Sequence, residues 1–157
     1  MCGIIGVLGK KDVVPSLIGG LKRLEYRGYD SAGIATLTAD GIDRRRAEGK
    51  LENLEKVLEG NGLQGLAGIG HTRWATHGVP NEVNAHPHMT KQIALVHNGI
   101  IENYRELADE LTAKGYSFES ETDTEIAAQL ITSYIDAGKT PEEAMAAALK
   151  HLHGAFS

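Results

Sequence analysis

Short apolar runs of strand type alternate with amphipathic helical segments along this chain, and no Pro/Gly/Ser-rich linker divides them. Periodicity and turn residues predict strands at residues 3–8, 31–38, 42–48, 65–73, 92–96 and 116–119. They predict helices at 51–60 and about 102–114, and helices that begin near Asp12, at Thr122 or Asp123, and at Thr140. Strands grouped towards both ends, with helices between them, indicate the α+β class with sheets covered by helices.

Size and composition limit the classes of protein to consider. The 157 residues suit one domain with one sizeable core, and 41% hydrophobic with 24% charged residues is typical of a globular protein. A net charge of -5 argues against a nucleic-acid partner. The single cysteine excludes an intrachain disulfide framework and favours a reducing compartment. Neither a signal peptide nor an apolar run long enough for a membrane span is visible, so a cytoplasmic location without a membrane partner is expected.

Two local patterns carry structural expectations. The basic run Arg44-Arg45-Arg46 follows a predicted turn, and a solvated strand face is favoured over a phosphate site. Near the other end, Thr140, Pro141 and Glu143 form a capping-box pattern for a helix that should end near Gly154. Residues 155–157 resemble the first residues of a further strand, so the chain is expected to be an incomplete domain.

The only cysteine, Cys2, follows the initiator methionine, and the small side chain at position 2 permits removal of Met1. The thiol and a free α-amine would then belong to one residue. Thiols titrate near ~8.5 and α-amines near ~7.7–8.0, so near neutral pH the amine can accept the thiol proton. Cys2 is therefore a candidate nucleophile with its own base. The alternative is a small apolar residue at the start of a strand.

Other residues of catalytic type follow predicted strands or begin helices. Arg73 ends a strand and could hold a carboxylate with two parallel hydrogen bonds, while Asp123 could accept from an ammonium group. Together they suit the zwitterionic end of an amino acid, although a structural salt bridge and a helix cap are the alternatives. Asn98 and the Gly99 N–H could stabilise an oxyanion, or they could simply form a turn.

Five of the seven histidines, His71, His77, His86, His88 and His97, fall within 27 residues. No cysteine or carboxylate stands among them with zinc-type spacing, so a metal site is not favoured and hydrogen bonding within loops is expected. The glycines at 65–70 lack both common phosphate-loop patterns.

Six segments, MCGIIG, YRGYDSAG, GHTRWATHG, NEVNAHPH, VHNGIIEN and SETDTE, occur in an order that resembles the class II glutamine amidotransferases. That family belongs to the amino-terminal nucleophile hydrolases, which have a four-layer αββα sandwich fold. The resemblance implies that Cys2 attacks the side-chain amide of glutamine, and that Asn98 and the Gly99 N–H form the oxyanion hole. It implies that Arg73 holds the substrate carboxylate and Asp123 the ammonium group. It further places Trp74, Thr76, His77 and His86 at the glutamine pocket and Arg27 and Gly28 close to the nucleophile, with no metal or organic cofactor.

The residues around Tyr29-Asp30 and Trp74-Ala75-Thr76-His77 resemble the branch that aminates fructose 6-phosphate more than the amidophosphoribosyltransferase branch. The resemblance implies a parent enzyme, expected to be a homo-oligomer, that uses the ammonia in a second half to make glucosamine 6-phosphate. That half is absent from these residues. The alternatives are the glutaminase domain of another class II amidotransferase and an incompletely folded, non-catalytic fragment.

Overall fold

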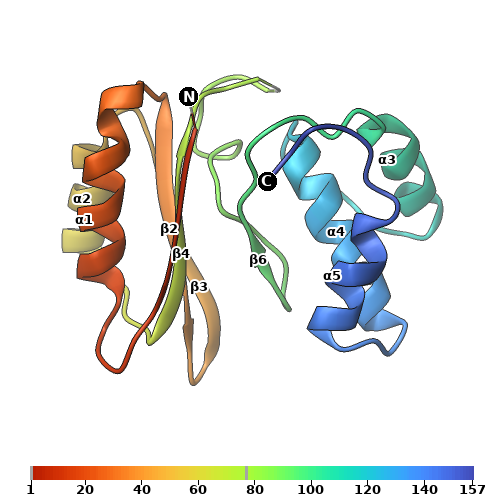
Figure 1. Cartoon of the computed structure of the whole chain (residues 1–157), viewed down its shortest axis with the longest axis horizontal. Coiled ribbons are helices and arrows are strands. Elements are labelled where there is room, and N and C mark those ends of the chain that lie inside the picture. Colours follow the sequence, from red (N-terminus) through yellow and green to blue (C-terminus); the bar gives the residue numbers. More distant parts are fainter. Residues whose placement is uncertain (1, 77) are drawn as a thin grey trace.

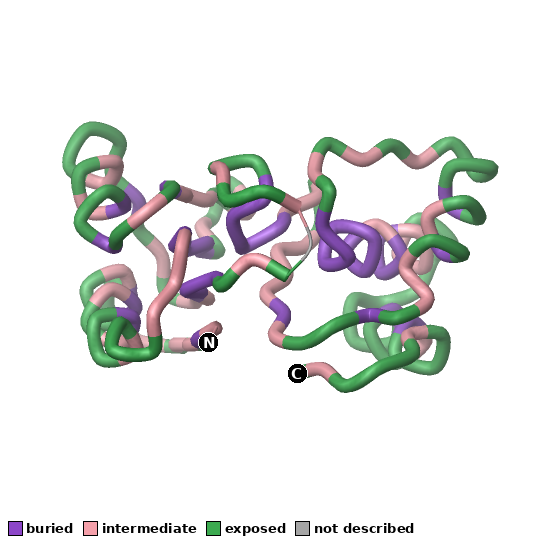
Figure 2. The backbone as a smooth tube through the Cα atoms, turned by 90° about the horizontal axis from the view of Figure 1, so that it is seen from above, coloured by how far each residue is buried: buried purple, intermediate pink, exposed green. Residues whose placement is uncertain are grey.

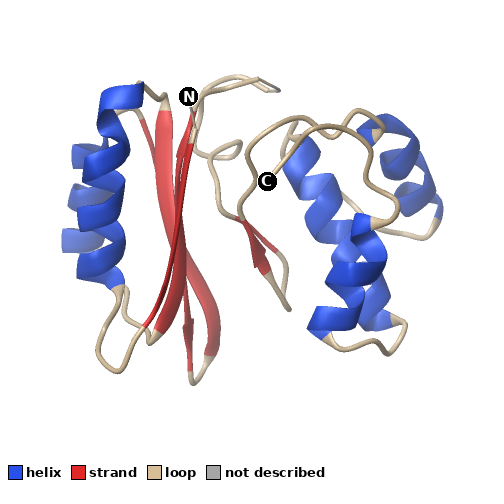
Figure 3. Cartoon of the chain, in the orientation of Figure 1, coloured by secondary structure: helices blue, strands red, loops and turns tan. Residues whose placement is uncertain are grey.

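The structure, a computed structural model, describes residues 2–76 and 78–157 in four layers (Figures 1 and 3). Its strands are β1 Gly3–Leu8, β2 Ser31–Thr38, β3 Gly41–Glu48, β4 Ala67–Arg73, β5 His88–Met89 and β6 Ala94–Leu95. Its α-helices are α1 Val14–Leu24, α2 Leu51–Gly60, α3 Tyr104–Ala113, α4 Asp123–Asp136 and α5 Pro141–Leu149, and a 3₁₀ turn, η1, covers Glu25–Arg27. The helices α1 and α2 cover one face of the larger sheet, and the β5–β6 pair lies beside the other three α-helices. No α-helix in the described ranges is long and apolar enough to cross a membrane.

The larger sheet is antiparallel with strand order β1-β4-β2-β3, so β4 lies inside it. Gly3 pairs with Thr72, and Ser31 pairs with Arg73. Cys2 and Arg73 therefore lie at the same end of the sheet, although they are 71 positions apart in the sequence. This register brings the two sequence-predicted site residues together.

Each half of the molecule has its own apolar core. The helical face of the larger sheet buries Leu17 and Leu21 of α1 and Leu51 and Leu54 of α2 against Ile34. The second core joins α3, α4 and α5. In Figure 2 the buried segments include α4, whose first six residues are all buried. Because the first turns of α4 are buried on every side, they form a rigid support for the residues at its amino terminus.

Histidines and threonines connect the two halves. The ring of His71 on β4 stacks on His86 with a centroid distance of 4.4 Å. His86 Nε2 lies 2.8 Å from Thr124 Oγ1 on α4, and His97 Nδ1 lies 2.9 Å from the same hydroxyl. His88 Nε2 lies 2.8 Å from Thr122 Oγ1. These side chains, which we call the histidine cluster (His71, His86, His88, His97, Thr122 and Thr124), are all buried.

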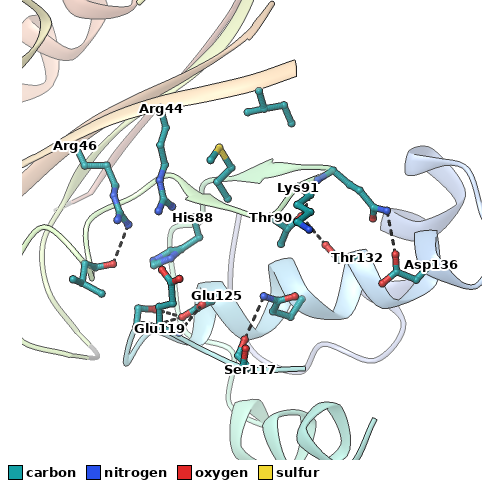
Figure 4. A pocket seen from close by; sticks show the side chains of 16 residues that line it. Arg44, Arg46, His88, Thr90, Lys91, Ser117, Glu119, Glu125, Thr132 and Asp136 are labelled. Carbon is teal, nitrogen blue, oxygen red and sulfur yellow. Dashed lines mark hydrogen bonds between the residues drawn. The ribbon is translucent and has the colours of Figure 1, made fainter. Parts of the chain in front are cut away.

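The basic run at 44–46 does not form the solvated strand face that its position after a turn predicted. Arg44 and Arg46 line a cavity of about 710 Å³ between β3, β5 and α4 (Figure 4). Arg46 donates to the carbonyl oxygens of Val83 and Ala85, both at 2.9 Å, and Arg44 donates to that of Pro87 at 3.3 Å. Burial lowers the pKa of Arg46 to about 10. These two side chains fasten the loop after β4 to β3.

Most of the other predicted elements are confirmed, and the differences have local causes. The capping box at Thr140 is present, but α5 ends at Leu149 instead of near Gly154. The N-cap of α1 is Val13 instead of Asp12, whose carboxylate accepts from the N–H groups of Val14 at 3.3 Å and of the distant Gly65 at 3.2 Å. The strand predicted at 92–96 is reduced to β6.

The strand predicted at 116–119 is wrong. Tyr116 and Phe118 pack against the core of α3, α4 and α5, and this segment has no strand partner. The backbone N–H groups of Glu119 and Ser120 donate instead to the Glu125 carboxylate, at 2.9 and 2.6 Å.

Substitution of Gly33 by alanine should destabilise the protein, because β2 runs directly under the loop that carries His86. A Cβ at position 33 would lie 2.2 Å from the His86 carbonyl oxygen, which is backbone and cannot rotate away. We expect Gly33→Ala to lower the free energy of unfolding by about 1–3 kcal/mol, as overpacking does. Denaturant unfolding measures this, with Gly6→Ala as the control, since a Cβ there meets nothing within 4 Å. Equal stability of the two variants would contradict the close approach.

The histidine cluster should make stability fall as the pH is lowered. Burial lowers the pKa of His71 to about 4 and that of His88 to about 3, whereas histidine in the unfolded chain titrates near ~6.5. Between these values the unfolded chain binds more protons, so the free energy of unfolding decreases by up to ~1.4 kcal/mol per pH unit for each histidine. Below about pH 4 the contribution of His71 should level off.

Denaturant unfolding at pH values between 4 and 7 tests this dependence. His88→Gln should reduce the slope, and replacement of the exposed His153 by glutamine should leave the slope unchanged. An unaltered slope in His88→Gln would show that this imidazole is not held neutral in the folded protein.

Candidate active site

Cys2 is half-buried immediately before β1 and lines a cavity of about 230 Å³. Its Sγ accepts a hydrogen bond from the Trp74 N–H at 3.1 Å and lies 3.5 Å from the Trp74 carbonyl oxygen. The thiol is thus held by the backbone of the residue after β4, with its sulfur at the cavity wall. The volume suits a small ligand, because drug-sized pockets span roughly 300–1,000 Å³.

Arg73 and Asp123 reach the same cavity from opposite halves of the molecule. Arg73 ends β4, is 3% exposed, and donates to Gly78 O at 3.3 Å and Val79 O at 3.5 Å. Burial lowers the pKa of Arg73, and the negative charges of Asp30 and Asp123, among others, oppose that effect. The guanidinium is therefore oriented by two loop carbonyls at the edge of the cavity.

Asp123 is the first residue of α4 and is 4% exposed. Its Oδ2 accepts from the Ile101 N–H at 2.8 Å, and its Oδ1 lies 4.0 Å from His97 Nδ1. The helix dipole stabilises a negative charge at this position. One cavity thus presents a fixed cation and a fixed anion to whatever enters it.

Asn98 follows β6 and lies beside Cys2. Its side-chain Nδ2 donates to Cys2 O at 3.4 Å, and its Oδ1 lies 2.8 Å from His71 Nε2. The amide is therefore held at both ends, with its nitrogen on the side of Cys2.

Gly99 is held by the end of the chain. Asn98 exchanges two backbone hydrogen bonds with Ser157, at 2.9 and 2.8 Å, and the Ile100 N–H donates to Ala155 O at 3.3 Å. In antiparallel pairing, a residue that lies between two hydrogen-bonded residues directs its own N–H away from the partner strand. The Gly99 N–H therefore points away from residues 155–157. Gly99 also lines the cavity and has a φ of +122°, and a Cβ there would lie 2.2 Å from Ala155 O. The strand-like pairing expected of residues 155–157 is thus present.

The remaining predicted site residues are placed as follows. Thr76 and His86 line the cavity, as does Trp74, whose side chain is 55% exposed. Gly28 packs on Trp74, since a Cβ there would lie 3.2 Å from the indole ring. Arg27 donates to the Tyr26 hydroxyl at 3.4 Å, and neither Arg27 nor Gly28 is among the residues that line the cavity. His77 lies outside the described residues.

Several cavity residues were not predicted from the sequence as parts of the site. They are His71, His97, Ile100, Thr122 and Thr124. Strand alternation could have indicated His71, because it precedes Arg73 by two residues and thus shares its face of β4. The threonines could be found only from the fold. Among the described residues, no group of three or more His, Cys, Asp or Glu side chains is arranged to hold a metal ion.

Comparison of the chain with known proteins identifies one family. A family model described as glutamine amidotransferase domain matches residues 71–157. The glutamine–fructose-6-phosphate aminotransferase (isomerizing) of Brucella abortus is 62% identical over all 157 residues, and that of Zymomonas mobilis is 57% identical. In both cases the chain spans 26% of the length of the relative.

Solved structures show the same fold. Glutamine phosphoribosylpyrophosphate amidotransferase from B. subtilis superposes with a TM-score of 0.84 at 26% identity, over 99% of this chain and 34% of its own. A structure described as the allosteric regulatory enzyme of purine biosynthesis gives a TM-score of 0.84 at 27% identity, over 100% and 34%. The α+β sandwich predicted from the sequence is confirmed. The chain belongs to the glutamine amidotransferase domain family.

Proposed function

We propose that this chain hydrolyses glutamine to glutamate and ammonia, with Cys2 as an amino-terminal nucleophile after removal of Met1. The observation that carries the proposal is that one small cavity collects four groups from four parts of the fold. They are the Cys2 thiol, the Arg73 guanidinium, the Asp123 carboxylate and the backbone at Gly99. Asn98 is not among the residues that line the cavity, but its side-chain amide donates to the carbonyl oxygen of Cys2 beside it. Each has a separate role in binding or hydrolysing an amino-acid amide.

Substrate binding follows from the charges at the cavity. The Arg73 guanidinium donates to the α-carboxylate of glutamine in a charge-assisted pair, and the Asp123 carboxylate accepts hydrogen bonds from the α-ammonium group. Both side chains are almost fully buried, so they are ordered before the substrate arrives. With its α-carbon fixed between these charges, glutamine extends its side-chain amide towards Cys2. Thr76, Trp74 and His86 complete the pocket, and His77 belongs to the same proposed set.

The chemical step is acyl transfer. The α-amine of Cys2 accepts the thiol proton, and the thiolate attacks the amide carbon of glutamine to form a tetrahedral intermediate. Asn98 Nδ2 and the Gly99 N–H stabilise its oxyanion. The protonated amine then gives its proton to the departing ammonia, and water hydrolyses the γ-glutamyl thioester to glutamate. No metal or organic cofactor takes part in these steps.

The relatives with 57–62% identity are named as aminotransferases of glutamine and fructose 6-phosphate. We infer that the ammonia serves to convert fructose 6-phosphate into glucosamine 6-phosphate, a step of amino-sugar biosynthesis. The chain spans 26% of the length of those relatives, so this amination is proposed as a reaction of the whole protein. Glutamine hydrolysis is proposed as the reaction of the cavity around Cys2. The 26% identity to the phosphoribosylpyrophosphate amidotransferase makes that branch the weaker alternative.

Cys2 must be the amino-terminal residue for glutamine hydrolysis, because its α-amine is the proposed base. Insertion of alanine between Met1 and Cys2 should abolish glutamate release, and Cys2→Ala should do the same. Intact mass after treatment with a glutamine-like electrophile reports both the removal of Met1 and labelling of the thiol. Full turnover by the insertion variant would contradict an α-amine base.

Replacement of Arg73 by alanine should weaken glutamine binding, because a hydrogen bond to a charged group contributes about 1.5–3 kcal/mol. We expect KM for glutamine to rise about 10–100-fold, which corresponds to that energy, and Asp123→Asn to raise KM in the same direction. Arg23→Ala, which removes an exposed cation of α1, is the matched control. A simple primary amide without the α-carboxylate should be hydrolysed equally by wild type and Arg73→Ala. If wild type hydrolysed glutamine and that amide with equal kinetics, neither Arg73 nor Asp123 would bind the substrate as proposed.

A further inference from the structure

The imidazole of His71 bonds directly to the side chain proposed to stabilise the oxyanion. His71 Nε2 lies 2.8 Å from Asn98 Oδ1 and 3.2 Å from the carbonyl oxygen of His97. A carbonyl oxygen can only accept a hydrogen bond, so the nitrogen that faces it carries the hydrogen. His71 is therefore the Nε2–H tautomer and a donor to both oxygens.

This donor determines which end of the Asn98 amide faces the nucleophile. Only the amide oxygen can accept from Nε2–H, so the amide nitrogen is directed to the opposite side, where it donates to Cys2 O at 3.4 Å. With the amide rotated by half a turn, its NH₂ would face another N–H, and its oxygen would face the region of the thiol. An oxygen there would repel a developing oxyanion instead of stabilising it.

The His71 ring is held by its surroundings. It is 1% exposed and stacks on His86 at 4.4 Å with an interplanar angle of 20°. His86 is in turn held by the Thr124 hydroxyl of α4 at 2.8 Å. Burial keeps the imidazole neutral at physiological pH by lowering the pKa of His71 to about 4, and the two oxygens that face Nε2 select the tautomer.

We propose that His71 is a positioning residue, whose Nε2–H holds the Asn98 amide with its nitrogen towards the nucleophile. The proposal deepens the proposed glutaminase function and rests on it for its kinetic consequences. This role is exerted through Asn98, so the effect of a substitution at His71 should appear in the chemical step and should depend on the presence of Asn98.

Two substitutions separate the hydrogen bond from the packing. His71→Leu replaces the imidazole with an apolar side chain of similar size that has no donor. His71→Gln keeps an N–H donor on a side chain of similar length. In the full chain with Cys2 amino-terminal, we expect His71→Leu to lower kcat for glutamine about 10-fold or more. This loss of kcat should not exceed the ~10²–10³-fold loss expected for Asn98→Ala, which removes the donor itself. KM should change less than twofold, and His71→Gln should recover most of kcat. A change confined to KM, or no recovery by glutamine, would overturn the proposal.

A double-mutant cycle with Asn98→Ala tests whether His71 acts through Asn98. Once Asn98 is alanine, His71→Leu should have little further effect on kcat. The control is His88→Leu, which removes another buried histidine that bonds Thr122 and not Asn98, so its effect should add to that of Asn98→Ala. Additive effects of His71→Leu and Asn98→Ala would show a general structural role for His71 and would overturn the proposal.

A spectroscopic measurement tests the role of His71 independently of the proposed glutaminase function. Nitrogen-15 NMR of the wild-type imidazole should show the Nε2-protonated tautomer of His71, whether or not the protein turns over glutamine. The Nδ1-protonated tautomer would overturn the proposal, even where His71→Leu fails to fold. An inactive wild-type protein with the expected tautomer would contradict the glutaminase function and leave the orientation of Asn98 supported.

Discussion

The arrangement of the site depends on one hydroxyl group. Thr124 Oγ1 lies within 3 Å of His86 from the loop after β4 and of His97 from the end of β6. A hydroxyl can donate to one imidazole and accept from the other, so it can bond to two buried rings at once. Because Thr124 follows Asp123 on the buried helix α4, this hydroxyl sets the position of the second half of the molecule relative to β4. The cavity around Cys2 lies where these segments meet.

A polar contact between the halves costs stability that an apolar one would not. Neutral imidazoles in a buried cluster lose part of their interaction with water, and an imperfectly bonded ring nitrogen carries a desolvation penalty. Among the described residues, His71 Nδ1 and His86 Nδ1 are buried without a hydrogen-bond partner. An apolar contact would join the halves as well, but it could not fix the direction of an amide. The cluster is therefore better explained by orientation at the site than by stability.

The sequence predicted local structure better than long-range contacts. Strand β1 and helix α2 have the predicted bounds, because periodicity and turn glycines act within a few residues. The half-buried Arg44 and Arg46 of β3 were mispredicted, since their partners are backbone carbonyls about 40 residues away, which leave no sequence pattern. The same limit applies to the site. Cys2, Arg73, Asn98 and Asp123 were predicted individually, whereas Thr122 and Thr124 gain their position only when α4 meets the loop after β4.

The two proposed oxyanion donors are held by independent means. The Gly99 N–H is aimed by backbone pairing with residues 155–157, which fixes φ at a value that favours glycine. The Asn98 amide is a side chain that could rotate, and the same backbone pairing does not restrain that rotation. It needs a donor on its oxygen, and β4 supplies one through His71, on the strand face that also carries Arg73. One strand thus orients both the group proposed to hold the substrate carboxylate and the group proposed to stabilise the transition state. Any shift of β4 against β6 would therefore disturb substrate binding and the chemical step together.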